Sequence, residues 1–167
     1  APGSADERSI RTRLGWLDVA ATTAPDIPRA VQLAHQIVTE RFDAVYLLGM
    51  GGSSLCAEVL RAVNGIAAGH PELYVLDTTD EQTITSAAAR LDPARTLFLV
   101  ASKSGGTVEV ASLERFFWAH LTAAEGSAAG RHFVAITDHG TALQRLAESK
   151  HYRDVFVNPA DIGGRFS

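Results

Sequence analysis

Residues 44–54 read AVYLLGMGGSS, and this stretch decides the fold. An apolar run typical of a buried strand passes into a glycine-rich turn, and residues 53–63 then place Leu55, Val59 and Val63 at helical spacing. Glycine lets the backbone turn tightly and approach a ligand. Unpaired N–H groups at the start of a helix favour an anion. The stretch therefore predicts a strand, an anion-binding turn and a helix in succession.

A second loop of the same kind follows the apolar run at residues 96–100. Residues 102–107 read SKSGGT, so that three hydroxyls, a lysine and two glycines meet where a strand is predicted to pass into a helix. Hydroxyls and backbone N–H groups can surround phosphate oxygens, with Lys103 supplying a positive charge if it turns inward. Two such loops in one sheet predict a site for a phosphorylated small molecule. The structural alternative is that Ser104 or Gly106 caps the helix and Lys103 is solvated.

Strand-length apolar runs alternate with helical patterns along the rest of the chain. Strands are predicted at 44–48, 73–76, 96–100, 132–136 and 154–157, and helices near 53–63, 80–90, 107–121 and 141–149, after an earlier helix with Pro28 in its first turn. Thr79 and Gln82 have capping-box spacing at the start of the 80–90 helix. Crossovers between parallel strands cover both faces of a sheet and gather the loops at the carboxyl ends of the strands. The pattern predicts a three-layer α/β/α sandwich with a five-stranded parallel sheet, flavodoxin- or Rossmann-like, with both glycine loops on one edge.

The two ends of the chain differ from its middle. Residues 1–26 combine a small polar start, a short helix candidate and a linker, and are expected to form an extension. Residues 27–161 are expected to form the α/β domain. Residues 162–167 begin a new glycine- and arginine-containing loop, which is expected to be the start of a further segment of a longer protein.

The composition excludes several classes of function. At 167 residues the chain is long enough for one core, and its net charge of −4 argues against a nucleic acid or an anionic membrane as partner, since both need a concentrated basic face. Cys56 is the only cysteine, which excludes an internal disulfide and agrees with a reducing, cytoplasmic compartment. The six histidines show no metal-ligand spacing, and no signal peptide or membrane-spanning stretch is present in the sequence.

Nucleotide-binding loops are an alternative explanation of the glycines. A dinucleotide fingerprint requires a third glycine where Ser54 stands, although Asp77 could imitate its ribose-binding acid. A Walker A loop is excluded, because Lys103 precedes its glycines and neither GKS nor GKT follows them. A dinucleotide-binding dehydrogenase domain is therefore secondary to a site for another phosphorylated small molecule.

Four ordered motifs resemble the first sugar isomerase (SIS) domain of glucose-6-phosphate isomerases. They are LLGMGGSSLCAEVL, VLDTTD, FLVASKSGGTVE and NPADIGGRFS, and the resemblance covers residues 27–167. It is especially close to the isomerase part of bacterial transaldolase/glucose-6-phosphate isomerase fusions. The resemblance implies interconversion of glucose 6-phosphate and fructose 6-phosphate through an enediolate, without a cofactor or metal, in glycolysis and gluconeogenesis.

The resemblance also implies which residues bind the substrate. The residues at phosphate-binding positions are Gly52, Ser53, Ser102, Lys103, Ser104 and Thr107. Arg165 matches the arginine of the family's GGR motif, which stabilises the enediolate, and is the predicted catalytic residue. Gly106 replaces a threonine that is usual in this loop, which removes one hydroxyl contact.

In the family, the base glutamate, the ring-opening histidine and a further lysine come from segments beyond the GGR motif. We therefore expect this chain to bind sugar phosphate but to turn over little or nothing without its C-terminal SIS half. The resemblance further implies that the full enzyme associates as a homodimer. An alternative from another class is a non-catalytic phosphosugar-sensing SIS module, which would use the same loops and would not need a base.

Overall fold

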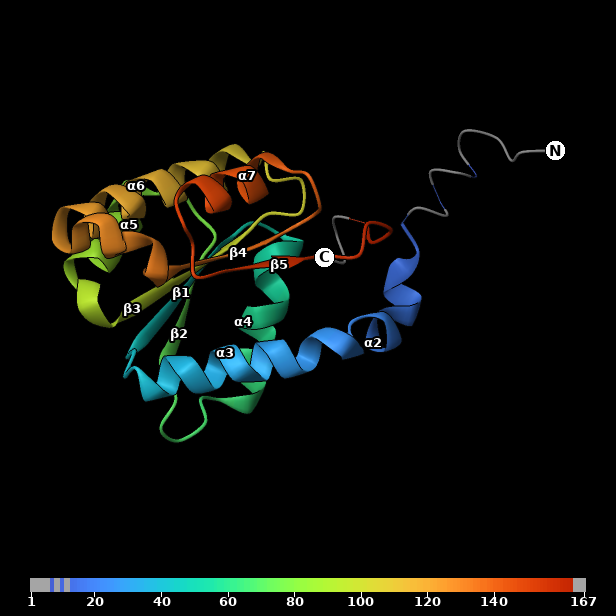
Figure 1. The fold of residues 1–167 in the computed structure, drawn as a ribbon, viewed down its shortest axis with the longest axis horizontal. Coiled ribbons are helices and arrows are strands. Elements are labelled where there is room, and N and C mark those ends of the chain that lie inside the picture. The colour runs from blue at the N-terminus through green and yellow to red at the C-terminus, as the bar shows by residue number, and fades with distance from the viewer. Residues whose placement is uncertain (1–6, 8–9, 11–12, 164–167) are drawn as a thin grey trace.

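The computed structural model describes residue 7, residue 10 and residues 13–163. Within this part of the chain, five parallel strands form one sheet in the order β2-β1-β3-β4-β5 (Figure 1). The strands are β1 (Ala44–Gly49), β2 (Glu72–Leu76), β3 (Thr96–Ala101), β4 (Phe133–Thr137) and β5 (Asp154–Val157). All five lie where the sequence predicted them, with ends that differ by one residue at most.

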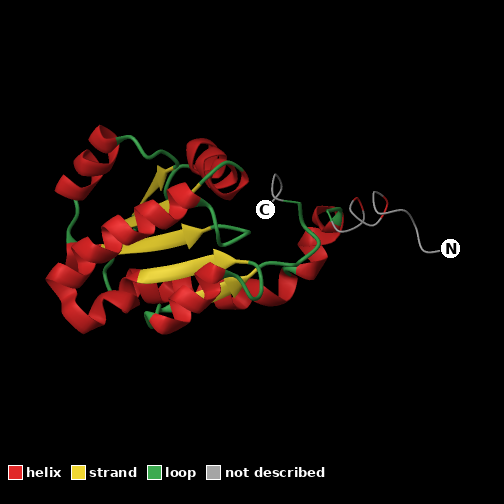
Figure 2. Ribbon diagram, turned by 90° about the horizontal axis from the view of Figure 1, so that it is seen from above, coloured by secondary structure: helices red, strands yellow, loops and turns green. Residues whose placement is uncertain are grey.

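Helices cover both faces of the sheet, as the sequence predicted. The main helices are α3 (Ile27–Thr39), α4 (Gly52–Asn64), α5 (Glu81–Ala89), α6 (Val108–Glu125) and α7 (Ala142–Ser149). Figure 1 shows the sheet with α5, α6 and α7 on one face and α3 and α4 on the other, and Figure 2 shows the strands and the surrounding helices from above. Within the described residues no helix is both long enough and apolar enough to span a membrane.

Short helical turns complete the fold. They are η1 (Gly15–Asp18), α2 (Val19–Thr22) and η2 (Ala24–Asp26) before α3, and η3 (Pro93–Arg95) and η4 (Gly126–His132) before β3 and β4. An isolated antiparallel bridge joins Leu14 to Ile162, and the amide of Gly15 donates to the carbonyl of Asp161 at 2.9 Å. The segment before α3 therefore contacts the segment after β5.

A row of aromatic rings runs across the sheet beneath α6. Tyr74, Tyr46, Phe98 and Phe133 are in register on β2, β1, β3 and β4, so their side chains emerge on the same face. The successive ring centroids are 4.9, 5.7 and 5.0 Å apart. Phe117 of α6 stacks on Phe98 at 4.8 Å, and Phe98, Phe117 and Phe133 are fully buried. This row forms the centre of the larger core.

One of the two predicted helix starts is confirmed and the other is wrong. Pro28 lies in the first turn of α3, as predicted. The capping box at Thr79 and Gln82 is wrong, because α5 begins at Glu81 and Asp80 is its N-cap. Oδ2 of Asp80 accepts from the amide of Thr83 at 2.8 Å and from its hydroxyl at 2.7 Å. These hydrogen bonds stabilise the carboxylate and lower the pKa of Asp80.

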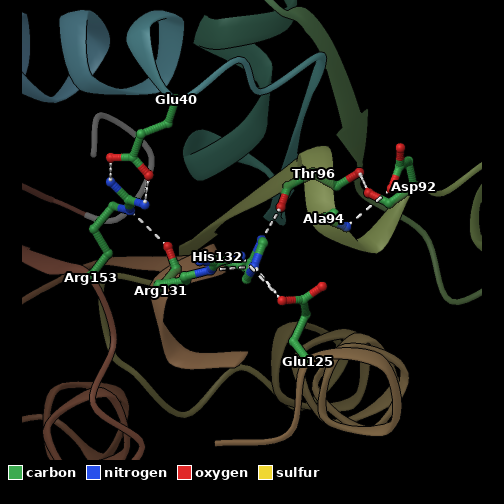
Figure 3. A network of polar contacts seen from close by, with 8 residues as sticks. All are labelled: Glu40, Asp92, Ala94, Thr96, Glu125, Arg131, His132 and Arg153. Atoms are coloured by element: carbon green, nitrogen blue, oxygen red, sulfur yellow. Dashed lines mark hydrogen bonds and ion pairs between the residues drawn. The ribbon is translucent and has the colours of Figure 1, made fainter. Parts of the chain in front are cut away.

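A polar network joins the amino ends of three neighbouring strands (Figure 3). His132, fully buried just before β4, donates from Nδ1 to the carbonyl of Thr96 at 2.9 Å and accepts at Nε2 from Nε of Arg131 at 3.0 Å. Arg153, just before β5, makes a two-pronged contact with Glu40 at 2.8 and 2.7 Å. This network lies at the opposite edge from the glycine loops. His132 is therefore structural.

Acidification is expected to destabilise the protein through His132. Burial lowers the pKa of His132, so between its ordinary pKa near 6.5 and the lowered value the unfolded chain binds a proton that the folded chain does not. The free energy of unfolding should then fall as pH falls below about 6.5, by up to about 1.4 kcal/mol per pH unit. Urea unfolding at pH 7.5 and 5.5 measures this loss. The free energy of unfolding of His132→Asn should fall less between these pH values than that of the wild type. The control variant His35→Asn, at an exposed position, should lose as much as the wild type. Equal losses in the wild type and both variants would contradict the role of His132.

Candidate functional site

The two glycine loops lie side by side at the carboxyl edge of the sheet. Gly49, the last residue of β1, is in register with Ala101, the last residue of β3. These strands are neighbours at the centre of the sheet, and from β1 the chain goes outward to β2 on one side before it returns to β3 on the other. In open α/β sheets such a reversal of strand order leaves a crevice, and ligands bind there. The predicted shared edge is confirmed.

The first loop needs glycine at two positions. Gly51, the N-cap of α4, has φ of 57° and ψ of −118°, a backbone conformation that L side chains rarely adopt. A Cβ atom on Gly49 would lie 2.9 Å from the carbonyl oxygen of Ser53, so a side chain there would push α4 away from β1. The hydroxyl of the buried Ser54 donates to the carbonyl of Gly51 at 3.0 Å and closes the turn. The glycines thus bring the start of α4 against the end of β1.

Hydroxyl groups of the second loop and of β4 hold the backbone of that loop in place. Oγ of the buried Ser102 lies 3.0 Å from Oγ1 of Thr107, across the loop. The hydroxyl of Thr137, at the end of β4, donates to the carbonyl of Ser102 at 2.7 Å. Gly105 has φ of 64°, and a Cβ atom on it would lie 2.6 Å from Cβ of Thr141. These contacts give the loop a defined shape.

Several backbone N–H groups of both loops are free to bind an anion. Among the described residues, the amides of Gly51 and Gly52 in the first loop donate to no other group. The same holds for the amides of Thr107, Val108 and Glu109 at the start of α6. The two helix N-termini also carry the positive ends of their helix dipoles. Together the loops offer amides and hydroxyls to a group with several negative oxygens.

Lys103 is paired with a carboxylate that the sequence did not single out. Its Nζ forms an ion pair with Oδ2 of Asp138, directly after β4, and both side chains are mostly buried. The amide of Asp138 donates to the carbonyl of Lys103 at 3.1 Å, and Nδ2 of Asn158, directly after β5, donates to Oδ1 of Asp138 at 3.3 Å. Lys103 is thus neither turned into the loop nor solvated. Its partner is Asp138, which lies 35 positions further along the chain.

Polar residues directly after neighbouring strands were the signal that could have revealed Asp138 and Asn158. The rule that located the loops after β1 and β3 applies equally to β4 and β5.

The other predicted site residues are placed as follows. Gly52 and Ser53 are half-buried at the start of α4. Ser104 is exposed, and its hydroxyl accepts from the amide of Gly106 at 3.3 Å. Thr107 is the N-cap of α6, so the alternative in which Ser104 or Gly106 caps that helix is wrong. Arg165 lies outside the described residues.

A buried carboxylate anchors α6 behind the second loop. Oε1 of Glu114 accepts from Nζ of Lys150 at 2.7 Å and from the hydroxyl of Tyr152 at 2.6 Å. Glu114 also lines a mostly apolar cavity of about 190 Å³ together with Ser102 and Thr107. Burial raises the pKa of Tyr152, which keeps its hydroxyl a hydrogen-bond donor to Glu114. These contacts hold α6 in place, and the second loop leads directly into the N-terminus of this helix.

A parallel sheet of order 2-1-3-4-5, with two glycine-rich turns where the order reverses, is a doubly wound α/β domain of the flavodoxin-like type. The phosphoglucose isomerase family model matches residues 35–167. The chain belongs to the phosphoglucose isomerase family. Tagatose-6-phosphate ketose/aldose isomerase from Escherichia coli has the same fold, with a TM-score of 0.59 and 17% identity over 99% of this chain and 46% of that chain.

Individual relatives support the same family. The glucose-6-phosphate isomerase of Campylobacter jejuni is 33% identical over 155 residues, which are 92% of this chain and 37% of that protein. The crystal structure of a glucose-6-phosphate isomerase from Chlamydia trachomatis has a TM-score of 0.73 and 27% identity, covering 95% of this chain and 32% of that one. The chain therefore spans about a third of the length of these relatives.

Proposed function

We propose that this chain is the phosphosugar-binding half of an isomerase that interconverts glucose 6-phosphate and fructose 6-phosphate. The observation that carries the proposal is the pair of hydroxyl-and-amide loops at the point where the strand order reverses. Membership of the phosphoglucose isomerase family supports a sugar phosphate as the ligand.

The phosphate group would bind between the two loops. The free amides of Gly51 and Gly52 would face it from one side, and the hydroxyls of Ser102 and Thr107 with the amides of α6 from the other. Charge-assisted hydrogen bonds from such groups are stronger than bonds between neutral partners. The sugar would then extend away from the sheet edge, toward residues that complete the site.

The chemical step moves one proton between carbons and one between oxygens. A carboxylate base takes the proton from C2 of the open-chain aldose, and the electron pair forms the enediolate with its negative charge on O1. A proton passes from the hydroxyl on C2 to O1, and the base returns its proton to C1 as the carbonyl forms at C2. Positive charge near the developing oxyanion lowers the barrier, which is the role we propose for Arg165. We propose that the base belongs to another part of the longer protein, so that this chain binds substrate without turning it over.

Calorimetric titration of the purified chain with glucose 6-phosphate and with glucose tests the proposal. We expect binding of the phosphorylated sugar and no measurable binding of glucose, because the loops recognise the phosphate. An isomerase assay on the same sample should show little or no conversion of fructose 6-phosphate. Equal binding of both sugars would reject the phosphate site. Turnover near that of a full enzyme would reject the proposal that the catalytic base lies outside this chain.

Neutralising Asp138 is expected to tighten phosphosugar binding. Asp138→Asn removes a negative charge near the proposed anion and releases Lys103 from its ion pair. An interaction of about 1 kcal/mol, usual for charges several ångströms apart near a protein surface, corresponds to about fivefold in affinity. Calorimetry should show tighter binding for Asp138→Asn and wild-type binding for Asp43→Asn, whose ion pair with Arg95 lies at the opposite edge. Weaker binding by Asp138→Asn would mean that the Lys103 ion pair positions the loop.

A further inference from the structure

A polar cavity of about 450 Å³ lies beside the edge strand β2 and is lined mainly by residues of β2 and α5. It shares no lining residue with the two glycine loops. Two aromatic residues, Tyr46 of β1 and Tyr74 of β2, contribute to it from the sheet. Arg61 reaches it from the last turn of α4, and Arg90 from the end of α5. The volume is in the range of pockets that bind metabolites.

Within the described part of the chain, the two arginines of this cavity have no carboxylate partner. Nε of Arg61 is buried and has no hydrogen-bond partner. Among the described residues, no carboxylate forms an ion pair with Arg61 or Arg90, whereas Arg95, Arg131 and Arg153 each pair with one. A buried N–H group without an acceptor destabilises the fold, and native structures contain few of them. An acceptor from outside the chain would remove this destabilisation for Arg61.

The two tyrosines line the sheet side of the cavity with their rings and add hydroxyl groups to it. The rings of Tyr46 and Tyr74 stack at 4.9 Å with 22° between their planes. Tyr46 is only 4% exposed, while Tyr74 is 38% exposed. Burial raises the pKa of Tyr46 and the positive charge of Arg90 opposes this rise, so the Arg90 guanidinium lies close enough to act on that phenol. Ser86 of α5 adds a hydroxyl to the same wall.

One carboxylate in the cavity restricts the kind of anion that can bind there. Asp80 lines the cavity at the start of α5, where its carboxylate already accepts from the amide and the hydroxyl of Thr83. Two guanidinium groups against one carboxylate leave a net positive charge. This balance favours a compact anion bound by the arginines over an extended polyanion, which would also meet Asp80.

We propose that this cavity is a second ligand site, separate from the glycine loops, that binds a small metabolite through a phosphate or carboxylate group. Guanidinium groups match the geometry of both kinds of oxyanion and hold them in two-pronged contacts. Arg61 and Arg90 bind the anionic group. The partly exposed ring of Tyr74 and the hydroxyl of Ser86 contact the remainder of the ligand.

Amide NMR titration of the 167-residue chain with inorganic phosphate and, separately, with citrate tests this site. We expect at least one of the two to shift the amides of residues 74–90 in a saturable way; a response to phosphate alone or to citrate alone identifies the preferred group. Arg61→Gln and Arg90→Gln should each weaken the binding that these shifts report by about tenfold or more. Arg115→Gln removes an equal charge from an exposed position on α6 and should leave it unchanged.

Two outcomes would overturn the second site. One is a wild-type titration in which neither anion shifts residues 74–90 at tens of millimolar, which requires no variant to fold. The other is unaltered binding at these residues in both arginine variants. Replacing Ser102 and Thr107 in the glycine loops should leave these shifts intact. The two sites can therefore succeed or fail independently.

Discussion

The double variant Ser102→Ala, Thr107→Val is expected to lose measurable glucose 6-phosphate binding. The two hydroxyls lie 3.0 Å apart and face each other across the second loop. A hydrogen bond to a charged group contributes about 1.5–3 kcal/mol, so each loss should weaken binding by about 10- to 100-fold. Valine keeps the shape of threonine, and removing both hydroxyls leaves no single unpaired partner behind. Calorimetry on the double variant and on the two single variants measures the effect.

Ser112→Ala is the matched control for this experiment. Ser112 lies on α6, but its hydroxyl donates to the carbonyl of Val108 in the same helix at 2.8 Å. Its removal should change affinity less than twofold. If the double variant bound glucose 6-phosphate as tightly as Ser112→Ala does, the second loop would not be the phosphate site.

Phe98→Ala is expected to cost the most stability of any single change considered. Phe98 is fully buried at the centre of the aromatic row and stacks on Tyr46, Phe117 and Phe133. Truncating a buried phenylalanine leaves a cavity and typically costs about 3–5 kcal/mol. Since whole domains are stable by only about 5–15 kcal/mol, this chain should then be close to unfolding at 37 °C. Urea unfolding followed by circular dichroism measures the loss.

Phe116→Ala provides the comparison for that loss. Phe116 neighbours Phe117 on α6 but is 36% exposed, so less apolar surface returns to water when it is truncated. We expect about 1 kcal/mol or less for Phe116→Ala. Equal losses for the two variants would mean that the aromatic row does not form the centre of the core.

The sheet could be predicted from the sequence because each strand is a short apolar run bounded by turn residues. Residues 44–48 and 96–100 are buried in the middle of the sheet, where both faces are covered and an uninterrupted apolar run is typical. The shared edge of the two loops followed from parallel topology alone. Helix periodicity was less informative, since the apolar positions Leu55, Val59 and Val63 of α4 are mostly exposed in this structure.

The remaining features depend on contacts between residues far apart in the chain. Lys103 and Asp138 are separated by 35 positions, and nothing local to either residue indicates their pairing. Arg61 reads as an ordinary cation near a helix C-terminus, and only the position of α4 beside β2 buries its Nε. The N-cap of α5 was missed by one residue, because Thr79 and Asp80 are both good capping residues and local spacing cannot rank them.

The proposed binding mode places one phosphate group between the two loops at the centre of the sheet edge. Amide NMR of the chain titrated with fructose 6-phosphate tests this most directly. We expect saturable shifts in both loops together, at residues 50–54 and 102–109, and their loss in the double variant Ser102→Ala, Thr107→Val. Shifts that occur in only one loop, or only beside the cavity of Arg61 and Arg90, would contradict it.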